Sequence, residues 1–220
     1  MKIFLDTANL QSIKHWALTG LIDGVTTNPT HLSKESGDIK KLLKEICETV
    51  ANGDVSIEVT ETDPQKVYAQ AKQIAAIAKN VTVKIPCHKD YYDIIKKLVD
   101  EGISINVTLV FTVIQSLLMC KLGVKYISPF IGRWDDIEVN GIDILEKMKF
   151  MIEEYDFEKT KIIAASIRHV KHFHDAIMAG ADVATVPINV LEKAVTHPLT
   201  DRGMKKFLDD WQKLEIKQFP

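Results

Sequence analysis

The chain has 220 residues, of which 46% are hydrophobic and 26% charged, as is ordinary for a soluble globular protein. This length is enough for one domain with a large core. The net charge of −2 predicts no broad basic surface, so nucleic acid is not an expected partner. No stretch approaches the roughly 20 apolar residues of a membrane span, so a membrane is not expected as a partner either.

Three cysteines, Cys47, Cys87 and Cys120, lie far apart in the chain. An odd and sparse set predicts reduced thiols rather than a disulfide framework or a zinc site. The N-terminal residues lack a long apolar segment with a cleavage site, so no signal peptide is expected. Together these features predict a cytoplasmic protein.

Strand-like and helix-like patterns alternate along the chain without a linker. Short β-branched runs predict eight strands, at residues 2–5, 22–26, 55–59, 81–85, 104–108, 126–128, 161–165 and 182–186. Helices are predicted at residues 11–19, 38–50, 64–79, 91–99, 112–121, 141–155, 169–178 and 190–194, and a last amphipathic helix at 201–211.

Eight strand–helix repeats are what a TIM barrel requires. An open doubly wound sheet is the alternative, but it usually has a glycine-rich first turn. Neither G-x-G-x-x-G nor G-x-x-x-x-G-K-[ST] occurs in the chain. The sequence therefore predicts an α/β (β/α)8 TIM barrel, a single domain over residues 1–220 with an extra C-terminal helix.

Lys84 lies inside the predicted strand at residues 81–85. Alternate side chains of a strand share a face, so Thr82 and Lys84 point one way. Burial disfavours the ammonium form, and a neutral amine can attack a carbonyl to form a Schiff base. A lysine whose head reaches solvent at a strand end is the alternative, and the other strand ends decide between the two.

Polar residues stand at the C-terminal ends of most predicted strands, which is where TIM barrels build their active sites. The interior of such a barrel is otherwise filled by branched apolar side chains. Each polar residue alone is explained by a structural hydrogen bond, but together they predict a wet pocket. They are Asp6, Asn28, Glu58, Lys84, Asn106 with Thr108, Ser128 and Ser166.

The residue types suggest a reaction. The amine of Lys84 can condense with a ketone, and Asp6 is the best-placed base for a departing hydroxyl proton. Glu58 with Thr108 could hold a water that shuttles protons during imine formation and hydrolysis.

Amide and cationic side chains predict the ligand. Asn28 and Asn106 offer donors and acceptors to the hydroxyls of a polyol. Ser166 is expected to end the seventh strand and open the next helix, where backbone N–H groups favour an anion. Arg133 and Arg168 can bind phosphate in a bidentate manner. Two ordinary surface arginines are the alternative, but TIM barrels often bind phosphate after strands seven and eight.

Five motifs are similar in order and spacing to the signatures of the transaldolase family, and the chain length resembles its short subgroup, which also contains the fructose-6-phosphate aldolases. The motifs run through the whole chain, and the second and third are highly specific. They are Leu5-Asp6-Thr7, Val25-Thr26-Thr27-Asn28-Pro29-Thr30, Val83-Lys84-Ile85-Pro86, Asn106-Val107-Thr108 and Ala165-Ser166-Ile167-Arg168.

The resemblance implies a class I aldolase-type barrel that needs no metal or cofactor. Such an enzyme of the pentose phosphate pathway moves a dihydroxyacetone unit from fructose 6-phosphate or sedoheptulose 7-phosphate to an aldose phosphate. Matching motifs make Lys84 the Schiff-base residue, Asp6 the acid/base, and Glu58 with Thr108 the water-holding pair. The substrate-binding residues implied are Asn28, Asn106 and Ser128 for the dihydroxyacetone unit, and Arg133, Ser166 and Arg168 for phosphate.

Two positions separate the activities of this subgroup. Its aldolases carry Gln where this chain has Glu58 and Tyr where it has Phe130. Both residues favour the transaldolase, because Phe130 cannot help to protonate the cleaved carbanion. His31 and Trp134 depart from the usual pattern, so the pocket rim and the acceptor preference stay open. A fructose-6-phosphate aldolase, a non-catalytic phosphosugar-binding barrel and a phosphate-binding isomerase are the rival interpretations.

The short subgroup usually forms rings of five, often two face to face, so a pentameric or decameric homo-oligomer is implied. Met204, Phe207, Leu208 and Trp211 are spaced for one helical face. This face could pack on a neighbouring copy, or it could equally cap its own barrel.

Three further features are weighed against a function. His169 and His172 share a helical face but His174 does not, and no acidic or cysteine ligand is patterned with them, so a polar helix start is predicted rather than a metal site. Asp135-Asp136 is predicted to be a solvated loop. Cys87 is a poor candidate nucleophile although it lies three residues after the candidate lysine.

Overall fold

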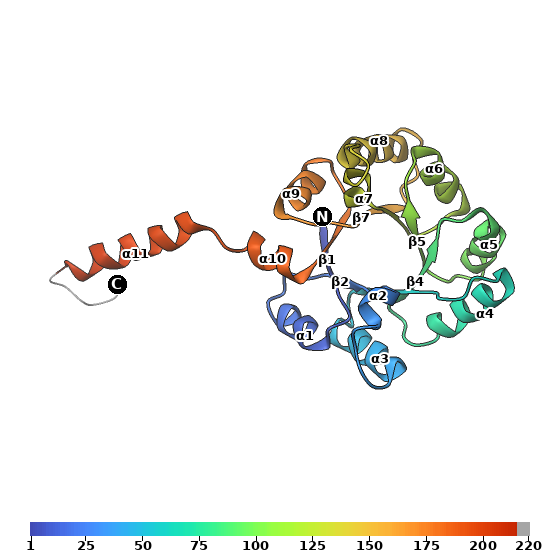
Figure 1. Cartoon of the computed structure of the whole chain (residues 1–220), viewed down its shortest axis with the longest axis horizontal. Coiled ribbons are helices and arrows are strands. Elements are labelled where there is room, and N and C mark those ends of the chain that lie inside the picture. The colour runs from blue at the N-terminus through green and yellow to red at the C-terminus, as the bar shows by residue number, and fades with distance from the viewer. Residues whose placement is uncertain (215–220) are drawn as a thin grey trace.

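The structure is a computed structural model that describes residues 1–214 (Figure 1). Eight parallel strands close into one barrel in sequence order, which confirms the predicted TIM barrel. The strands are β1 (Lys2–Asp6), β2 (Gly24–Thr26), β3 (Asp54–Glu58), β4 (Val81–Pro86), β5 (Ile105–Val110), β6 (Tyr126–Pro129), β7 (Lys161–Ala164) and β8 (Val183–Val186).

Helices surround the barrel at the predicted places. They are α1 (Leu10–Leu18), α3 (Ile39–Thr49), α4 (Pro64–Ala75), α5 (Tyr92–Asp100), α6 (Val113–Leu122), α8 (Gly141–Glu154), α9 (Val170–Met178) and α10 (Ile188–Ala194). Side chains fix several starts: Asp38 accepts two backbone N–H groups before α3, Asp63 does so before α4, and Thr112 forms a capping box with Gln115 at α6.

Three short helices were not predicted: α2 (Pro29–Leu32), η1 (Lys89–Tyr91) and α7 (Ile131–Asp135). Helices this short are hard to recognise because they show no amphipathic period. A local signal does exist for α2, since Asn28 caps it and Pro29 takes its first position. The prediction of a solvated loop at Asp135-Asp136 is correct in that both residues are exposed, but wrong in that Asp135 ends α7 and Asp136 caps it.

The core has two parts. The larger one lies between the barrel and the helices, and includes Val25, Val83 and Ile105. A smaller cluster of Phe4, Tyr126, Ile163 and Val183 is buried at the N-terminal ends of the strands. Gly24 is required beside it, because a Cβ there would lie 2.5 Å from the carbonyl oxygen of Asp54 and 2.7 Å from the Phe4 ring. This end of the barrel is closed by packed side chains.

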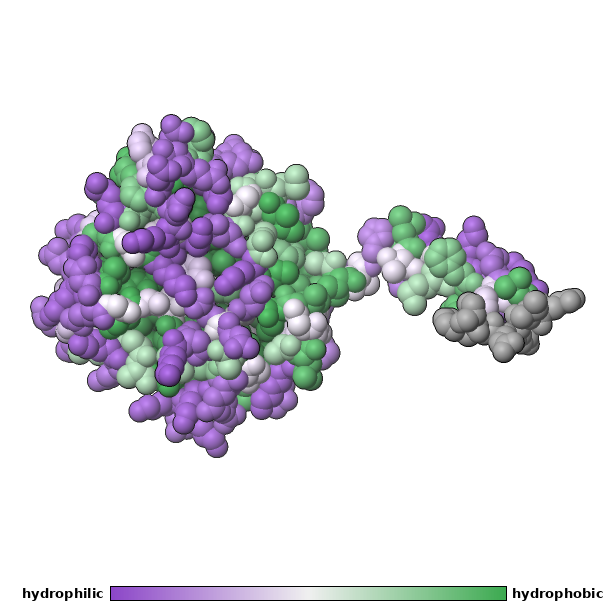
Figure 2. All heavy atoms as spheres, turned by 180° about the vertical axis from the view of Figure 1, so that it is seen from behind, coloured by the Kyte–Doolittle hydropathy of each residue, from purple (hydrophilic) through white to green (hydrophobic). Residues whose placement is uncertain are grey.

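The last helix, α11 (Pro198–Gln212), stands away from the barrel (Figure 1; Figure 2). None of the residues described in α11 is buried, and its apolar residues Met204, Phe207, Leu208 and Trp211 are exposed. The alternative in which this helix caps its own barrel is therefore wrong. None of the helices described has the length and hydropathy that a membrane crossing requires.

Candidate active site

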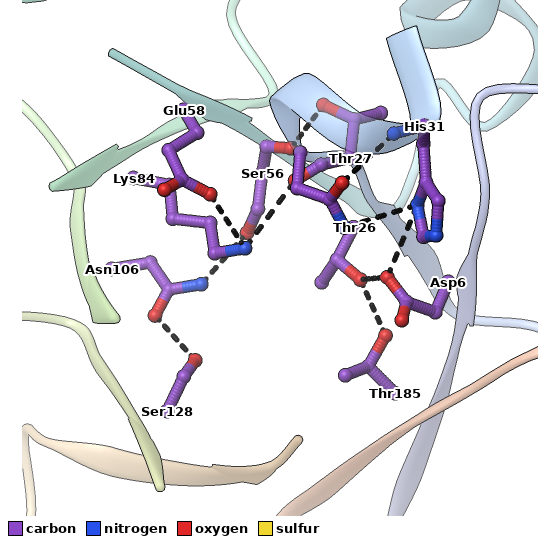
Figure 3. Close-up of polar contacts among 11 residues, drawn as sticks. Asp6, Thr26, Thr27, His31, Ser56, Glu58, Lys84, Asn106, Ser128 and Thr185 are labelled. Atoms are coloured by element: carbon purple, nitrogen blue, oxygen red, sulfur yellow. Dashed lines mark hydrogen bonds and ion pairs between the residues drawn. The ribbon is translucent and has the colours of Figure 1, made fainter. Parts of the chain in front are cut away.

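The predicted polar residues meet at the C-terminal mouth of the barrel. Strand register places Glu58 beside Lys84 and Lys84 beside Asn106, and all three side chains point toward the barrel centre (Figure 3). A cavity of about 450 Å³ opens there. The predicted site residues that line it are Asp6, Asn28, Glu58, Lys84, Ser128, Phe130, Arg133 and Ser166.

Lys84 is only 5% exposed. Its Nζ lies 2.9 Å from Glu58 Oε2 and donates a 3.4 Å hydrogen bond to the carbonyl oxygen of Thr27. The ring centroid of Phe130 is 6.0 Å from the same nitrogen. A lysine must lose a proton before it attacks a carbonyl, and the Glu58 carboxylate is in contact to take that proton.

An amide and two hydroxyls form a buried row beside the lysine (Figure 3). Ser128 Oγ donates to Asn106 Oδ1 at 2.7 Å, and Asn106 Nδ2 donates to Ser56 Oγ at 3.1 Å. These contacts fix which way the amide of Asn106 faces. Asn106 itself is fully buried and supports the cavity from beneath rather than lining it, while Ser128 reaches the cavity.

Asp6 lies across the cavity on β1. Its Oδ1 accepts a 2.8 Å hydrogen bond from Thr26 Oγ1, which also contacts Thr185 Oγ1. No hydrogen bond engages Asp6 Oδ2 among residues 1–214, so this oxygen is left for a ligand. Neither threonine was predicted as a site residue, although Thr26 lies in a family motif and alternation along each strand places both on the inward face. Thr185 is the polar residue that β8 contributes to this end of the barrel, where none was predicted.

Thr108 is fully buried on β5, in register with Pro86. Within the described chain, its Oγ1 has no hydrogen-bond partner. A buried hydroxyl without a partner is uncommon in folded proteins, so this atom has a free donor and acceptor beside the lysine's strand.

Strand β5 also carries a strained residue. The register with β6 shifts between Val107 and Val110, and Leu109 has a φ of 55°. A branched side chain in this left-handed region is strained. The shift carries the strand past its predicted end at residue 108 and lets Leu109 line the cavity.

The predicted phosphate residues do not all meet. Arg133 on α7 and Ser166 line the cavity. Ser166 has a φ of 59° and does not open a helix as predicted, because α9 begins only at Val170. Arg168 is not among the lining residues, and its guanidinium forms a bidentate pair with Asp136. That hydrogen-bonded guanidinium lowers the pKa of Asp136.

His31 and Trp134, the two residues outside the usual family pattern, differ in whether they line the cavity. His31 lines the cavity, and its Nδ1 is 3.6 Å from Asp6 Oδ1. Trp134 is not among the lining residues, and its ring packs edge-on against Phe111 at 5.9 Å between centroids.

Asp135, His169 and His172 lie close enough to suggest a metal site, although no acidic residue is patterned with these histidines in the sequence. However, His169 Nδ1 accepts the backbone N–H of His172, and His172 Nδ1 accepts that of Arg168. Both neutral rings then carry their proton on Nε2, and His172 donates it to Asp135 at 2.6 Å. The group is a hydrogen-bonded helix start, with His169 as the N-cap of α9.

The three cysteines are free, as the sequence predicted. Burial raises the pKa of Cys87, and it raises the pKa of Cys47 and Cys120 to about 11. These thiols are therefore protonated near neutral pH and are poor nucleophiles.

Comparisons with known proteins identify the family of the chain. Residues 3–218 match the family model described as Transaldolase/Fructose-6-phosphate aldolase. A protein from Petrotoga mobilis is 49% identical over 98% of this chain and 96% of its own length. One from Lactiplantibacillus plantarum is 49% identical over 99% and 100%, and one from Nitrosopumilus maritimus is 47% identical over 99% and 97%. All three are named "Probable transaldolase".

Solved structures with low identity share the fold. Thiamine phosphate pyrophosphorylase from Pyrococcus furiosus has a TM-score of 0.56 at 16% identity, over 84% of this chain and 85% of that one. A flavocytochrome b2 variant with pyruvate bound has a TM-score of 0.61 at 11% identity, over 85% and 57%. These two support the barrel alone, whereas the family match and the curated relatives identify the chain as an enzyme of the transaldolase/fructose-6-phosphate aldolase family.

Proposed function

We propose that this protein is a transaldolase of the pentose phosphate pathway that works through a Schiff base on Lys84. It would transfer a dihydroxyacetone unit from sedoheptulose 7-phosphate or fructose 6-phosphate to glyceraldehyde 3-phosphate or erythrose 4-phosphate. The observation that carries the proposal is the lysine itself, almost wholly buried at the foot of a cavity and 2.9 Å from the Glu58 carboxylate.

Imine formation is the first step. Lys84 passes a proton to Glu58, attacks the ketone carbon, and the resulting carbinolamine loses water. Glu58 and Thr108 would hold this water, and the support is the buried Thr108 hydroxyl that has no partner in the described chain. Cleavage of the substrate then needs no cofactor, because the iminium nitrogen is itself the electron sink.

Carbon–carbon cleavage is the second step. Asp6 Oδ2 takes the proton from the C4 hydroxyl of the ketose, and the O–H electron pair becomes the C=O of the departing aldehyde. The electron pair of the C3–C4 bond forms the C=C of an enamine, and the π pair of the C=N bond moves to the iminium nitrogen. Asn28 and Ser128, which line the cavity, would bind the hydroxyls of the dihydroxyacetone unit, and Asn106 would hold Ser128 in place. The released product is an aldose phosphate.

Phosphate binding would fall first to Arg133 and the backbone around Ser166, since both residues line the cavity. Arg168 would join them only by leaving its carboxylate partner Asp136. Arginine forms the same bidentate geometry with phosphate as with carboxylate. A phosphate can therefore take the place of Asp136 and accept the same two hydrogen bonds from Arg168.

Phe130 favours transfer over release. Its ring lies 6.0 Å from the lysine nitrogen and offers no proton or water-binding hydroxyl to the enamine. The enamine therefore waits for an acceptor aldehyde.

The test is to mix the enzyme with fructose 6-phosphate alone, follow glyceraldehyde 3-phosphate, and then add erythrose 4-phosphate. A transaldolase gives one stoichiometric burst and turns over only after the acceptor arrives. Steady release without acceptor would show a fructose-6-phosphate aldolase. No release, and no borohydride-trapped adduct on Lys84, would favour the binding barrel.

Phe130→Tyr is the matched variant for this test. It restores the hydroxyl that the aldolases carry, so we expect continuous release of dihydroxyacetone without acceptor. Phe111→Tyr is its control, because Phe111 packs behind Phe130 and is not among the residues that line the cavity. Release that increases equally in both variants would contradict the role given to Phe130.

The protein would act as a homo-oligomer, a pentamer or a decamer, in the cytoplasm. Exposed apolar residues on α11 support assembly, because they bury nothing in their own barrel and a neighbouring copy would cover them. Free cysteines fit a reducing compartment. Light scattering of Phe207→Ser/Trp211→Ser against the unmodified chain tests assembly, and an unchanged mass would contradict this role of α11.

A further inference from the structure

His31 contacts the candidate acid/base residue from the first turn of α2. Its Nδ1 lies 3.6 Å from Asp6 Oδ1 (Figure 3). The same nitrogen lies 3.2 Å from Asn28 Nδ2. Both His31 and Asp6 are largely shielded from solvent, with side chains 23% and 19% exposed. One ring nitrogen therefore faces a carboxylate oxygen and an amide at the same time.

The Asn28 amide determines which nitrogen of the His31 ring carries the proton. Asn28 Oδ1 accepts the backbone N–H of His31 at 2.9 Å as the N-cap of α2, so its Nδ2 is the atom turned toward the ring. An amide nitrogen only donates. His31 Nδ1 is then an acceptor, and the neutral ring carries its proton on Nε2.

This arrangement points a lone pair of His31 at the Asp6 carboxylate. Either the ring or the carboxylate can take up a proton to turn that contact into an attractive one. An imidazolium beside Asp6 would stabilise the carboxylate and make it a weaker base, whereas a neutral imidazole leaves it a stronger one. Cleavage requires the proton that Asp6 accepts to come from the substrate.

We propose that His31 is a positioning residue that sets how strongly Asp6 holds a proton. Neutral His31 supports Asp6 as the base of cleavage, and protonation of His31 weakens it. The inference rests on the proposed function, in which Asp6 receives the hydroxyl proton on Oδ2. The other charged groups lining the cavity are Glu58, Lys84 and Arg133.

The test is the rate of the single burst of glyceraldehyde 3-phosphate from fructose 6-phosphate between about pH 5 and 8, the range in which histidine side chains ordinarily titrate. We expect the unmodified enzyme to slow about three- to tenfold at the acid end. In His31→Asn, whose amide stands near the position of Nδ1 but cannot titrate, the part of this acid limb that His31 causes should disappear, so that the limb is shallower than in the unmodified enzyme. His174→Asn, at an exposed histidine of α9, should keep it.

Borohydride trapping on Lys84 separates the two proposals. An adduct in the unmodified enzyme and in His31→Asn shows that the amine and the fold are intact, so the pH profiles then decide the role of His31. The same acid limb in His31→Asn, or no limb in the unmodified enzyme, would overturn the inference. Loss of the adduct in the variant alone would also overturn it, because His31 would then be needed for imine formation, the step before cleavage. No adduct in the unmodified enzyme would refute the Schiff-base function itself.

Discussion

The two ends of the barrel interior are built on opposite principles. At the N-terminal floor, Phe4 and Tyr126 pack edge-on, and Asp54 accepts from Lys125 at 2.6 Å and from Tyr126 at 2.7 Å. At the mouth, near the C-terminal ends of the strands, Thr108 has a buried hydroxyl without a partner in the described chain. Asp54 at the floor is paired within the chain, whereas Thr108 and Asp6 Oδ2 at the mouth are left for a ligand. Of the other buried hydroxyls in the described chain, Thr82 near the start of β4 also has no partner.

The largest expected effect comes from Lys84→Arg at the mouth. Arginine keeps a positive charge beside Glu58, but the guanidinium stays protonated and cannot form an imine. We expect kcat for transaldolase turnover to fall by about 10³-fold or more. Lys72→Arg is the matched control, because Lys72 forms an ion pair of the same length, 2.9 Å, with Glu101 on the surface. Measurable turnover in Lys84→Arg above background would contradict the Schiff-base role.

The next effect concerns substrate binding. Arg133→Gln should raise KM for phosphorylated donors by about 10- to 100-fold, the range expected when a hydrogen bond to a charged group is lost. Arg168→Gln should do less, because its guanidinium is held by Asp136. Steady-state kinetics of the two variants compares them directly. A larger effect in Arg168→Gln would show that this pair opens when substrate binds.

The floor should respond in the opposite way. Tyr126→Phe removes one of the two donors to Asp54 and should lower the free energy of unfolding by about 1–2 kcal/mol. Urea titration measures this loss, and steady-state kinetics should show unchanged kcat and KM. A change in kcat would mean that the two ends of the barrel are coupled.

The smallest effect expected is on acid stability. Burial lowers the pKa of His172, so this ring is neutral in the folded chain at pH values where the unfolded chain, with a pKa of about 6.5, begins to bind a proton. Its contribution to stability is complete above that value and declines as the pH falls below it. In His172→Gln, the melting temperature should fall less between about pH 6.5 and 5. An identical slope would assign the acid sensitivity to other groups.

The sequence was sufficient for the barrel and for most of its mouth, for a physical reason. A strand alternates its side chains, so the inward position of Lys84 and Glu58 follows once the strands are recognised. The same rule applies to Thr26 and Thr185, which were overlooked because single threonines are common in apolar strands.

Other features depend on contacts that no local pattern reveals. The pairing of Arg168 with Asp136 and of His172 with Asp135 requires α7 and the start of α9 to meet in space. The register shift at Leu109 arises between two strands rather than within one. The Arg168–Asp136 pair changed the predicted phosphate site, and the register shift changed the predicted end of the strand. Neither could be predicted from the spacing of residues in the sequence.

The projecting helix α11 gives the protein an internal optical reporter. A 15-residue helix that buries nothing in its own barrel is held only by local hydrogen bonds, and isolated helices of this length are marginal in water. Of the three tryptophans, Trp16 is buried on α1, Trp134 lies on α7, and Trp211 is 41% exposed on α11. Under the proposed assembly, in which a neighbouring copy covers this face of α11, intrinsic fluorescence should shift on dilution as Trp211 becomes exposed, without any label.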